Sequence, residues 1–328
     1  MSNMPALEVR DLRTYFRTRA GIVKAVDGVS FSIERGKVFG LVGESGSGKS
    51  ITGFSIMGLI DPPGHIESGT ILLNGRNLVG LREEGMRELR GNRVAMIFQD
   101  PMMTLNPVLR IDTQMIETVL AHADVGRKEA WTRSRDALGK VGIPSPEERL
   151  KSYPHQLSGG MRQRVAIAIA LLHQPDLIIA DEPTTALDVT IQAQILAEVQ
   201  KLCAETGTAM IWITHDLSVV SSLADEIAVM YAGRIVEIGQ VDAVFDHPHH
   251  PYTVGLIESL PSRNHRGEPL KQIAGMTPSL ANLPRGCAFR ARCDYSGDAC
   301  LAEPPLTAMP GGSHVRCFYP RVATEEVR

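Results

Sequence analysis

Residues 43–50 read Gly43-Glu44-Ser45-Gly46-Ser47-Gly48-Lys49-Ser50, which satisfies the pattern GxxxxGK[ST]. The stretch follows the apolar run Lys37–Val42 and opens a helical pattern at Lys49–Leu59, the context that a phosphate-binding loop requires. In such a loop, backbone N–H groups curl around phosphate oxygens and the next helix directs its positive end at them. Lys49 would supply a charge to the outer phosphates and Ser50 a hydroxyl for Mg²⁺. We therefore predict a nucleotide site made by Gly43, Ser45, Gly46, Ser47, Gly48, Lys49 and Ser50.

A second apolar run, Leu177–Ala180, ends in two carboxylates, Asp181 and Glu182. A buried strand that ends in aspartate brings this side chain near the Mg²⁺ of a nucleotide in a P-loop protein. Glu182 points to the other side of the strand and can polarise an attacking water. We predict that Asp181 helps to bind Mg²⁺ and nucleotide, and that Glu182 is the general base.

The size and composition of the chain fit an ordinary globular protein. It has 328 residues, 43% of them hydrophobic and 22% charged, and a net charge of −3. This charge disfavours nucleic acid as a partner. No run reaches the ~20 apolar residues that span a bilayer, and the charged start of the chain is unlike a secretory signal. We therefore predict a cytosolic protein that does not bind nucleic acid.

The order of predicted elements indicates an α/β architecture. Short β-branched runs alternate with helical patterns over the first ~240 residues, whereas the stretch from Asp100 to Pro154 is helical in pattern throughout. After Gly239 the sequence His247-Pro248-His249-His250-Pro251 breaks the chain, and a Pro-rich stretch then leads to a cysteine-bearing tail. We predict a nucleotide-binding domain at 1–245, with a helical subdomain at about 100–160, and an extension at 246–328.

The sequence Leu157-Ser158-Gly159-Gly160-Met161-Arg162-Gln163-Arg164 precedes the acidic strand by some twenty residues. Ser158, Gly159 and Gly160 open a helix and offer a second anion site. Together with the P-loop, this pattern resembles the LSGGQ-type signature of the ATP-binding subunits of ABC transporters. Met161 stands where that family most often has glutamine. The resemblance implies a P-loop NTPase fold of the ABC ATPase type, with a RecA-like mixed sheet and a helical subdomain.

The other motifs of this family occur in its usual order. Gln99 resembles the Q-loop glutamine that touches Mg²⁺ and water, and Asp188 resembles the D-loop aspartate that crosses a dimer interface. His215 resembles the switch histidine that holds the γ-phosphate and orients Glu182. Phe16 aligns with the aromatic residue that stacks on adenine, although Tyr15 could serve instead. The resemblance implies an ATPase in which two such domains enclose two ATP molecules, each held by one subunit's P-loop and the other's signature.

The end of the chain points to one branch of the family. The segments VMYAGRIVEIGQ, FDHPHHPYT and LPRGCAFRARCDYSGDAC resemble the C-terminal region of dipeptide and oligopeptide importer ATPases. This implies a translocase that drives peptide import at the cytoplasmic face of the inner membrane, with a sister ATPase, two permeases and an external solute-binding protein as partners. Nickel and other small-solute importers share this branch and stay open as an alternative. A soluble ABC ATPase without permeases is disfavoured, because the chain has one cassette, a short insertion and no basic arm.

Four of the five cysteines, Cys287, Cys293, Cys300 and Cys317, lie within thirty-one residues. Four thiolates can hold either Zn²⁺ or a [4Fe–4S] cluster. Zinc sites usually show a tight CxxC pair, which is missing here, and the importer resemblance also favours the iron–sulfur cluster. We predict a [4Fe–4S] cluster with zinc, or no metal, as alternatives. The nearby Arg285, Arg290, Arg292 and Arg316 could offset its negative charge or simply face solvent.

Overall fold

The computed structural model describes residues 4–19, 21–184, 189–264, 267 and 271–321. The chain divides into two compact units, each assembled from separate stretches. The first unit contains residues 1–7, 33–38 and 73–212, and the second contains residues 8–32, 39–72 and 213–328. The phosphate-binding loop therefore belongs to the second unit, and the acidic strand with the signature belongs to the first.

Parallel strands form the centre of the first unit. Strands β6 (Val94–Ile97) and β7 (Leu177–Asp181) pair in parallel, with Val94 opposite Leu177. Every residue of both strands is buried, as expected for parallel strands covered on both faces. Strand β8 (Ala209–Thr214) begins in this unit beside β7 and follows α7 (Val189–Thr206). Asp181, a predicted site residue, is the last residue of β7.

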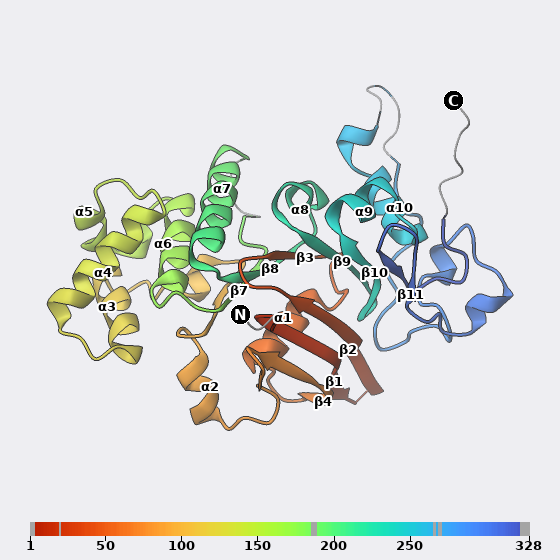
Figure 1. The fold of residues 1–328 in the computed structure, drawn as a ribbon, viewed down its shortest axis with the longest axis horizontal. Helices are drawn as coiled ribbons and strands as arrows, with labels where there is room; N and C mark the ends of the chain where they lie inside the picture. The colour runs from red at the N-terminus through yellow and green to blue at the C-terminus, as the bar shows by residue number, and fades with distance from the viewer. Residues whose placement is uncertain (1–3, 20, 185–188, 265–266, 268–270, 322–328) are drawn as a thin grey trace. The chain divides into compact units, whose positions relative to one another are not determined.

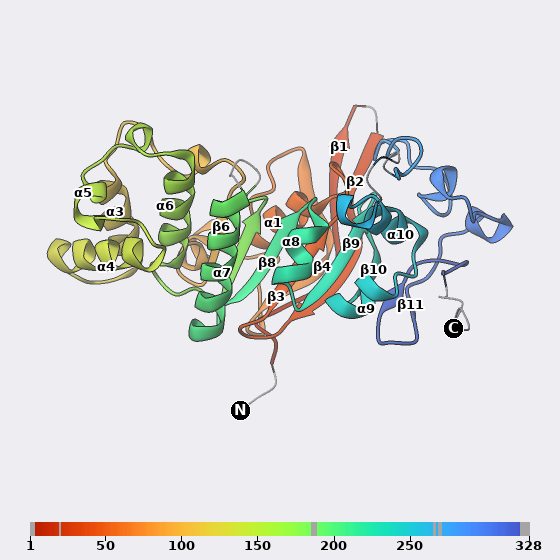
Figure 2. The same ribbon diagram turned by 90° about the horizontal axis from the view of Figure 1, so that it is seen from above.

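Helices fill the chain between β6 and β7 (Figure 1). Helix α4 packs against α3, α5 and α6, and Val119 and Ala130 lie at the centre of this contact. Figure 2 shows the same helices from above, at one end of their unit. The helices between the two strands are η1 (Pro101–Met103), α3 (Ile111–His122), α4 (Arg127–Lys140), α5 (Pro146–Leu150), η2 (Pro154–Gln156) and α6 (Gly159–Leu171), and α2 (Glu83–Leu89) lies before β6. The short β5 (Arg76–Asn77) precedes them.

The second unit contains a mixed sheet with the strand order β11-β12-β10-β9-β3. Phe39 of β3 lies opposite Glu226 of β9 in a parallel pair, whereas β9 and β10 are antiparallel. Helix α1 (Lys49–Met57) follows β3, and α8, α9 and α10 follow later in the chain. The bounds are β3 (Val38–Val42), α8 (Leu217–Leu223), β9 (Glu226–Tyr231), β10 (Arg234–Gln240), α9 (Val241–Asp246), α10 (Pro251–Glu258), β11 (Thr307–Ala308) and β12 (His314–Val315).

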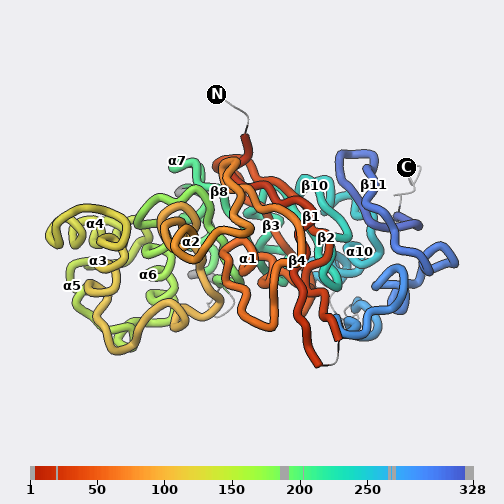
Figure 3. Tube along the Cα trace, turned by 90° about the horizontal axis from the view of Figure 1, so that it is seen from below, coloured from red at the N-terminus to blue at the C-terminus, as the bar shows by residue number. Residues whose placement is uncertain are grey.

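A second, antiparallel layer in this unit has the order β2-β1-β4. Its strands are β1 (Leu7–Thr18), β2 (Gly21–Ile33) and β4 (Gly64–Leu73). Figure 3 shows β1 and β2 side by side, and it shows the largely irregular path of the described residues beyond α10. Among the described residues of that path, the helices are the short η3 (Pro261–Arg263), η4 (Arg290–Arg292) and η5 (Asp298–Leu301), and the strands are β11 and β12.

The residues after 245, predicted as a separate extension, share the sheet of the second unit. Strand β12 pairs with β10, and Val315 lies opposite Glu237. The Glu237 carboxylate is fully buried and accepts backbone N–H bonds from His249 (2.7 Å) and His250 (2.9 Å). The histidine- and proline-rich segment therefore attaches the start of the extension to β10 through these two hydrogen bonds. Within the described ranges no helix is both long and apolar enough to cross a bilayer.

Candidate functional site

The turn from β3 to α1 has the backbone of a phosphate-binding loop. Gly43 and Gly48 adopt φ of 150° and 104°, which side-chain-bearing residues rarely reach. A Cβ at Gly43 would lie 2.2 Å from the Met230 oxygen, and one at Gly48 would lie 2.3 Å from the Ala25 oxygen. Gly46, at φ 78°, has open space around it. The first two glycines thus let the loop pack, and the third leaves its tip open to a ligand.

The Lys49 ammonium lies inside this loop. Its Nζ donates to the Gly43 oxygen (2.8 Å) and to the Glu44 oxygen (3.0 Å), and the residue is only 4% exposed. Helix α1 starts at Lys49 with Gly48 as N-cap, so no side chain caps its first turn. Uncapped N–H groups together with a buried ammonium suit an anion such as a phosphate group. Ser47 is buried, Ser50 is half-buried, and Ser45 is exposed at the tip.

The two aromatic residues that precede the loop have different environments. Tyr15 is 9% exposed, and its hydroxyl donates to Asp27 Oδ1 at 2.6 Å. Phe16 is more exposed, and its ring lies against Gly64, where a Cβ would come within 2.5 Å of Phe16 Cε1. Tyr15 is committed to a buried hydrogen bond, so Phe16 is the better candidate to stack on a base.

His215, also in the second unit, follows β8 directly and is exposed. The next residue, Asp216, caps α8 by accepting the Ser218 N–H at 2.9 Å. This cap fixes the backbone at the end of the strand. The predicted switch histidine is thereby presented on a short ordered turn.

In the first unit the structure brings together two predicted catalytic residues. Gln99 Nε2 donates to Glu182 Oε2 at 3.3 Å. Asp181, the last residue of β7, is 7% exposed, and Glu182 follows in the left-handed region at φ 47°. This backbone conformation is strained for a residue with a side chain and is typical of functional sites.

The signature forms the start of α6. Ser158 is the N-cap, and its hydroxyl accepts the Met161 N–H at 3.3 Å. Ser158 and Gly159 are exposed, and Gly160 is half-buried. Leu157 is buried at 4% exposure and fixes the loop to the unit. The predicted D-loop residue Asp188 lies outside the described residues.

Comparisons with known proteins identify the family of this chain. Residues 26–185 match the ABC transporter family, and residues 236–300 match the C-terminal region of oligopeptide/dipeptide transporters. The oligopeptide transport ATP-binding protein OppD of Escherichia coli is 46% identical over 314 residues, covering 96% of this chain and 93% of the relative. AppD of Bacillus subtilis, with the same description, is 49% identical over 314 residues, covering 95% and 96%. The chain is an ATP-binding protein of the ABC transporter family.

The solved dimeric structure of the ATP-binding cassette MJ0796, in a post-hydrolysis state with ADP and Pi, has a TM-score of 0.65 and 25% identity to this chain. It covers 72% of this chain and 98% of its own. The predicted α/β fold of the P-loop ABC ATPase type, with a mixed sheet and helices, is thus confirmed. The chain is accordingly an ATPase.

The four late cysteines of this ABC ATPase converge. The Cys287 N–H donates to the Cys300 oxygen at 3.0 Å, and a Cβ at Gly286 would lie 2.3 Å from the same oxygen. Burial raises the pKa of Cys317 to about 11, with smaller contributions from the other three thiols. Within the described residues, however, no group of three or more His, Cys, Asp or Glu side chains is arranged to hold a metal ion. In the described ranges, the predicted metal site at these four cysteines is therefore not found, for zinc or for a cluster.

Two of the four arginines that could offset a cluster charge, Arg292 and Arg316, have other partners. Arg316 donates to the Ile235 oxygen (3.1 Å) and the Pro304 oxygen (3.3 Å). Arg292 binds Glu44 of the phosphate-binding loop through two hydrogen bonds, of 2.7 and 3.0 Å. The sequence analysis missed this pair, because 248 residues separate its members. The only hint in the sequence was that Glu44, a charged residue, stands at one of the unspecified positions of the GxxxxGK[ST] pattern.

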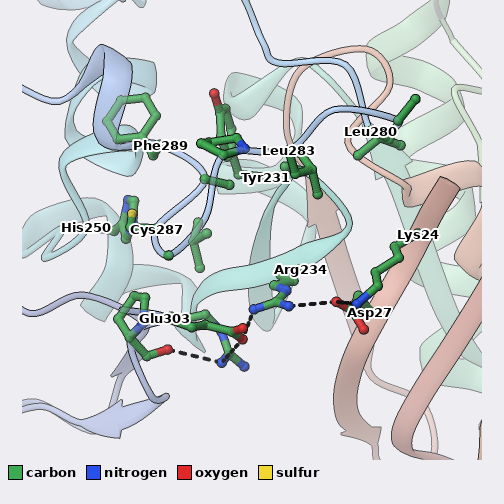
Figure 4. Close-up of a pocket in the computed structure, with 18 of the residues that line it drawn as sticks. Lys24, Asp27, Tyr231, Arg234, His250, Leu280, Leu283, Cys287, Phe289 and Glu303 are labelled. Atoms are coloured by element: carbon green, nitrogen blue, oxygen red, sulfur yellow. Dashed lines mark hydrogen bonds and ion pairs between the residues drawn. The ribbon is translucent and has the colours of Figure 1, made fainter. Parts of the chain in front are cut away.

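Beside the cysteines is a cavity of about 320 Å³, shown in Figure 4. Leu280, Leu283 and Phe289 form apolar parts of its lining, and Arg234 bridges Asp27 (2.6 Å) and Glu303 on the charged side. Burial alone would raise the pKa of Asp27, but hydrogen bonds from Tyr15 and Arg234 hold it below its usual value. These ion pairs join the extension to β2 and β10 within the second unit.

Proposed function

We propose that this ABC ATPase powers the import of oligopeptides through a membrane transporter. The carrying observation is that its likeness to OppD and AppD runs over nearly the whole chain and includes the C-terminal region, residues 236–300. Both relatives are described as oligopeptide transport ATP-binding proteins. The ATPase core alone would fit any branch of the family, so the C-terminal region supports the choice of substrate class.

The residues of the two units suggest the division of labour in hydrolysis. Lys49 and the N–H groups of α1 bind the phosphates, and Phe16 stacks on adenine. Mg²⁺, when bound by Ser50, Gln99 and Asp181, would neutralise phosphate charge. Glu182 orients the attacking water and accepts its proton, while His215 holds the γ-phosphate. Gln99, which already contacts Glu182, excludes and orders water at that carboxylate.

We further propose that the exposed Ser158 and Gly159 close on the ATP held by a second ATPase subunit, and that Asp188 crosses the same interface. A sister ATPase, two permeases and an external solute-binding protein would complete the transporter. The chain would then lie at the cytoplasmic face of the inner membrane as a peripheral subunit. In this scheme residues 1–245 act as the nucleotide-binding domain and 246–328 as the importer-type extension.

The test of transport is uptake of a labelled tetrapeptide by cells that carry the complete transporter. Wild-type chain should support uptake, and Glu182→Gln should abolish it while the subunit still pellets with membranes that contain its permeases. Uptake of nickel but not of peptide would favour the small-solute alternative. A chain that stays in the supernatant despite its permeases would contradict the transport proposal.

We also propose that Cys287, Cys293, Cys300 and Cys317 hold a [4Fe–4S] cluster. The electrostatic interaction of Cys317 with the other three thiols supports it, and their wide spacing in the sequence suits a cubane better than a single zinc ion. A thiol with a pKa near 11, such as Cys317, needs a metal to become a thiolate ligand. Anaerobic purification should yield about four irons and four acid-labile sulfides per chain. One zinc per chain, or no metal, would contradict the cluster.

A further inference from the structure

The C-terminal extension binds the phosphate-binding loop through the Glu44 side chain. Arg292 donates from Nη1 to Oε2 (2.7 Å) and from Nη2 to Oε1 (3.0 Å), so the two planar groups form a fork. Thr277 Oγ1 donates to the same Oε2 at 2.6 Å. Arg292 is the last residue of η4 and directly precedes Cys293. The loop that carries the cysteines is thus joined to the P-loop by a charged pair.

Arg292 is held in a fixed position from several sides. Its side chain is 5% exposed, and its Nε donates to the Ala274 oxygen at 2.9 Å. The guanidinium also lies 5.8 Å from the ring centres of Tyr231 and Phe289. Because these contacts fix the fork, Arg292 loses little further freedom when it binds Glu44.

The extension also binds the backbone of the P-loop. The Glu44 N–H donates to the Tyr252 hydroxyl at 2.8 Å. Tyr252 is fully buried and packs against Tyr231, with ring centres 4.7 Å apart. Side chain and backbone of Glu44 are therefore both held by residues that lie after position 245.

The charge of Glu44 explains why its contacts with Arg292 and Tyr252 matter for nucleotide binding. Its carboxylate lies close enough to Lys49 for the ammonium to help lower the pKa of Glu44, after the larger effect of the Arg292 hydrogen bonds. Glu44 is therefore ionised, and its charge lies beside the place where the phosphates of ATP bind. An unpaired carboxylate there would repel the phosphates and compete with them for Lys49.

We propose that Arg292 is a positioning residue for ATP: it neutralises Glu44 and fixes the P-loop, so that Lys49 is left to the phosphates. Thr277 and Tyr252 support the same arrangement. The extension is then part of the nucleotide site, and any change in the cysteine loop that moves Arg292 weakens ATP binding.

The test measures binding of the fluorescent analogue mant-ATP, with Mg²⁺, to the full-length chain. We expect Arg292→Gln to raise the Kd about tenfold, equivalent to about 1.4 kcal/mol. The loss should shrink as salt is added, because salt screens the repulsion by Glu44. Arg285→Gln is the matched control, since Arg285 is an exposed arginine of the same extension, and its Kd should equal that of the wild type.

The double variant Glu44→Gln/Arg292→Gln separates charge neutralisation from a merely structural role. Removal of the carboxylate should restore the Kd to within about threefold of the wild type. Glu44→Gln alone should bind mant-ATP more tightly, since Arg292 then adds an uncompensated positive charge. A double variant as weak as Arg292→Gln would overturn the proposal. If Arg292→Gln does not fold, weaker binding by Glu44→Gln would overturn it equally.

Discussion

Two helix starts in this ABC ATPase offer their N–H groups to an anion in different ways. Helix α1 begins after Gly48 without a side-chain cap, and the buried Lys49 lies beside it. Helix α6 begins after Ser158, which caps the helix with its own hydroxyl, and its first residues are exposed. The start of α1 contains a buried ammonium, whereas the start of α6 exposes its first residues to solvent.

This difference suggests separate roles for the two helix starts, one in binding ATP and the other in completing the site of a second subunit. The P-loop has a buried cation and a loop clamped through Glu44, so it can hold phosphates within one chain. At the signature, the Ser158 hydroxyl already accepts the Met161 N–H, and Ser158 and Gly159 are exposed. We therefore expect the P-loop to set ATP affinity and the signature to act only when two ATPase subunits meet.

The largest expected effect belongs to neither helix start. Glu182→Gln should lower the rate of ATP hydrolysis about a thousandfold, because the amide cannot accept the proton of water. Binding of mant-ATP should persist, since the P-loop is untouched. The measurement is multi-turnover phosphate release, with Glu205→Gln, an exposed glutamate of α7, as control. Release near the wild-type rate would remove Glu182 from the role of general base.

Lys49→Ala tests the enclosed helix start. Loss of the buried ammonium should raise the Kd for mant-ATP about a hundredfold, since a charge-assisted bond to phosphate disappears. Lys151→Ala, which alters an exposed lysine of the first unit, should bind like the wild type. An unchanged Kd in Lys49→Ala would show that the loop backbone alone binds ATP.

Gly159→Asp tests the exposed helix start. A Cβ at Gly159 meets no atom within 4 Å, so the variant should fold. The new carboxylate should repel a phosphate brought by another subunit and lower hydrolysis by the assembled transporter about tenfold or more. The Kd of the isolated chain should not change. Gly126→Asp, at the equally open start of α4, is the control. A weakened Kd in Gly159→Asp would contradict the division between the two helix starts.

The smallest expected effect is a pH dependence within the second unit. Burial lowers the pKa of His250 to about 3, and its Nδ1 accepts the Tyr252 N–H at 3.0 Å. The unfolded chain protonates this histidine near pH 6.5. The stability that neutral His250 contributes is therefore complete above about pH 6.5 and is lost as the pH falls toward 3.

Between about pH 7.5 and about pH 5.5, the Tm of the wild type should fall about 3 °C more than that of His250→Asn, whose amide oxygen can accept the same N–H. Thermal unfolding at the two pH values provides the measurement. The exposed His247→Gln should retain the wild-type dependence. An identical fall in wild type and His250→Asn would exclude His250 as the source.

The sequence predicted the parts of the site that depend on local order. The P-loop, the acidic strand and the signature each join a strand or loop to a helix over a few residues, so spacing and residue type suffice. The hydrogen bond of Tyr15 to Asp27 could not be predicted, because nothing in the pattern says which of two adjacent aromatics turns inward. The structure separates them by burial.

Contacts over long sequence distances escaped prediction for a physical reason. The pairs Arg292–Glu44 and Tyr252–Glu44 join residues 248 and 208 positions apart, and no periodicity encodes such pairs. Arg292 lies next to Cys293 in the sequence, so it was expected either to offset the charge of a cluster or to face solvent. Side-chain direction, rather than proximity in sequence, decides its partner.

Strand β12 has a consequence for how the chain can be divided. It covers one edge of β10, while Glu237 of β10 depends on the N–H groups of His249 and His250. A chain cut at residue 245 would expose that edge to pairing with other chains and bury a carboxylate without donors. We therefore expect a chain cut at residue 245 to fold poorly, because residues 249, 250 and 314–315 complete the sheet of the second unit.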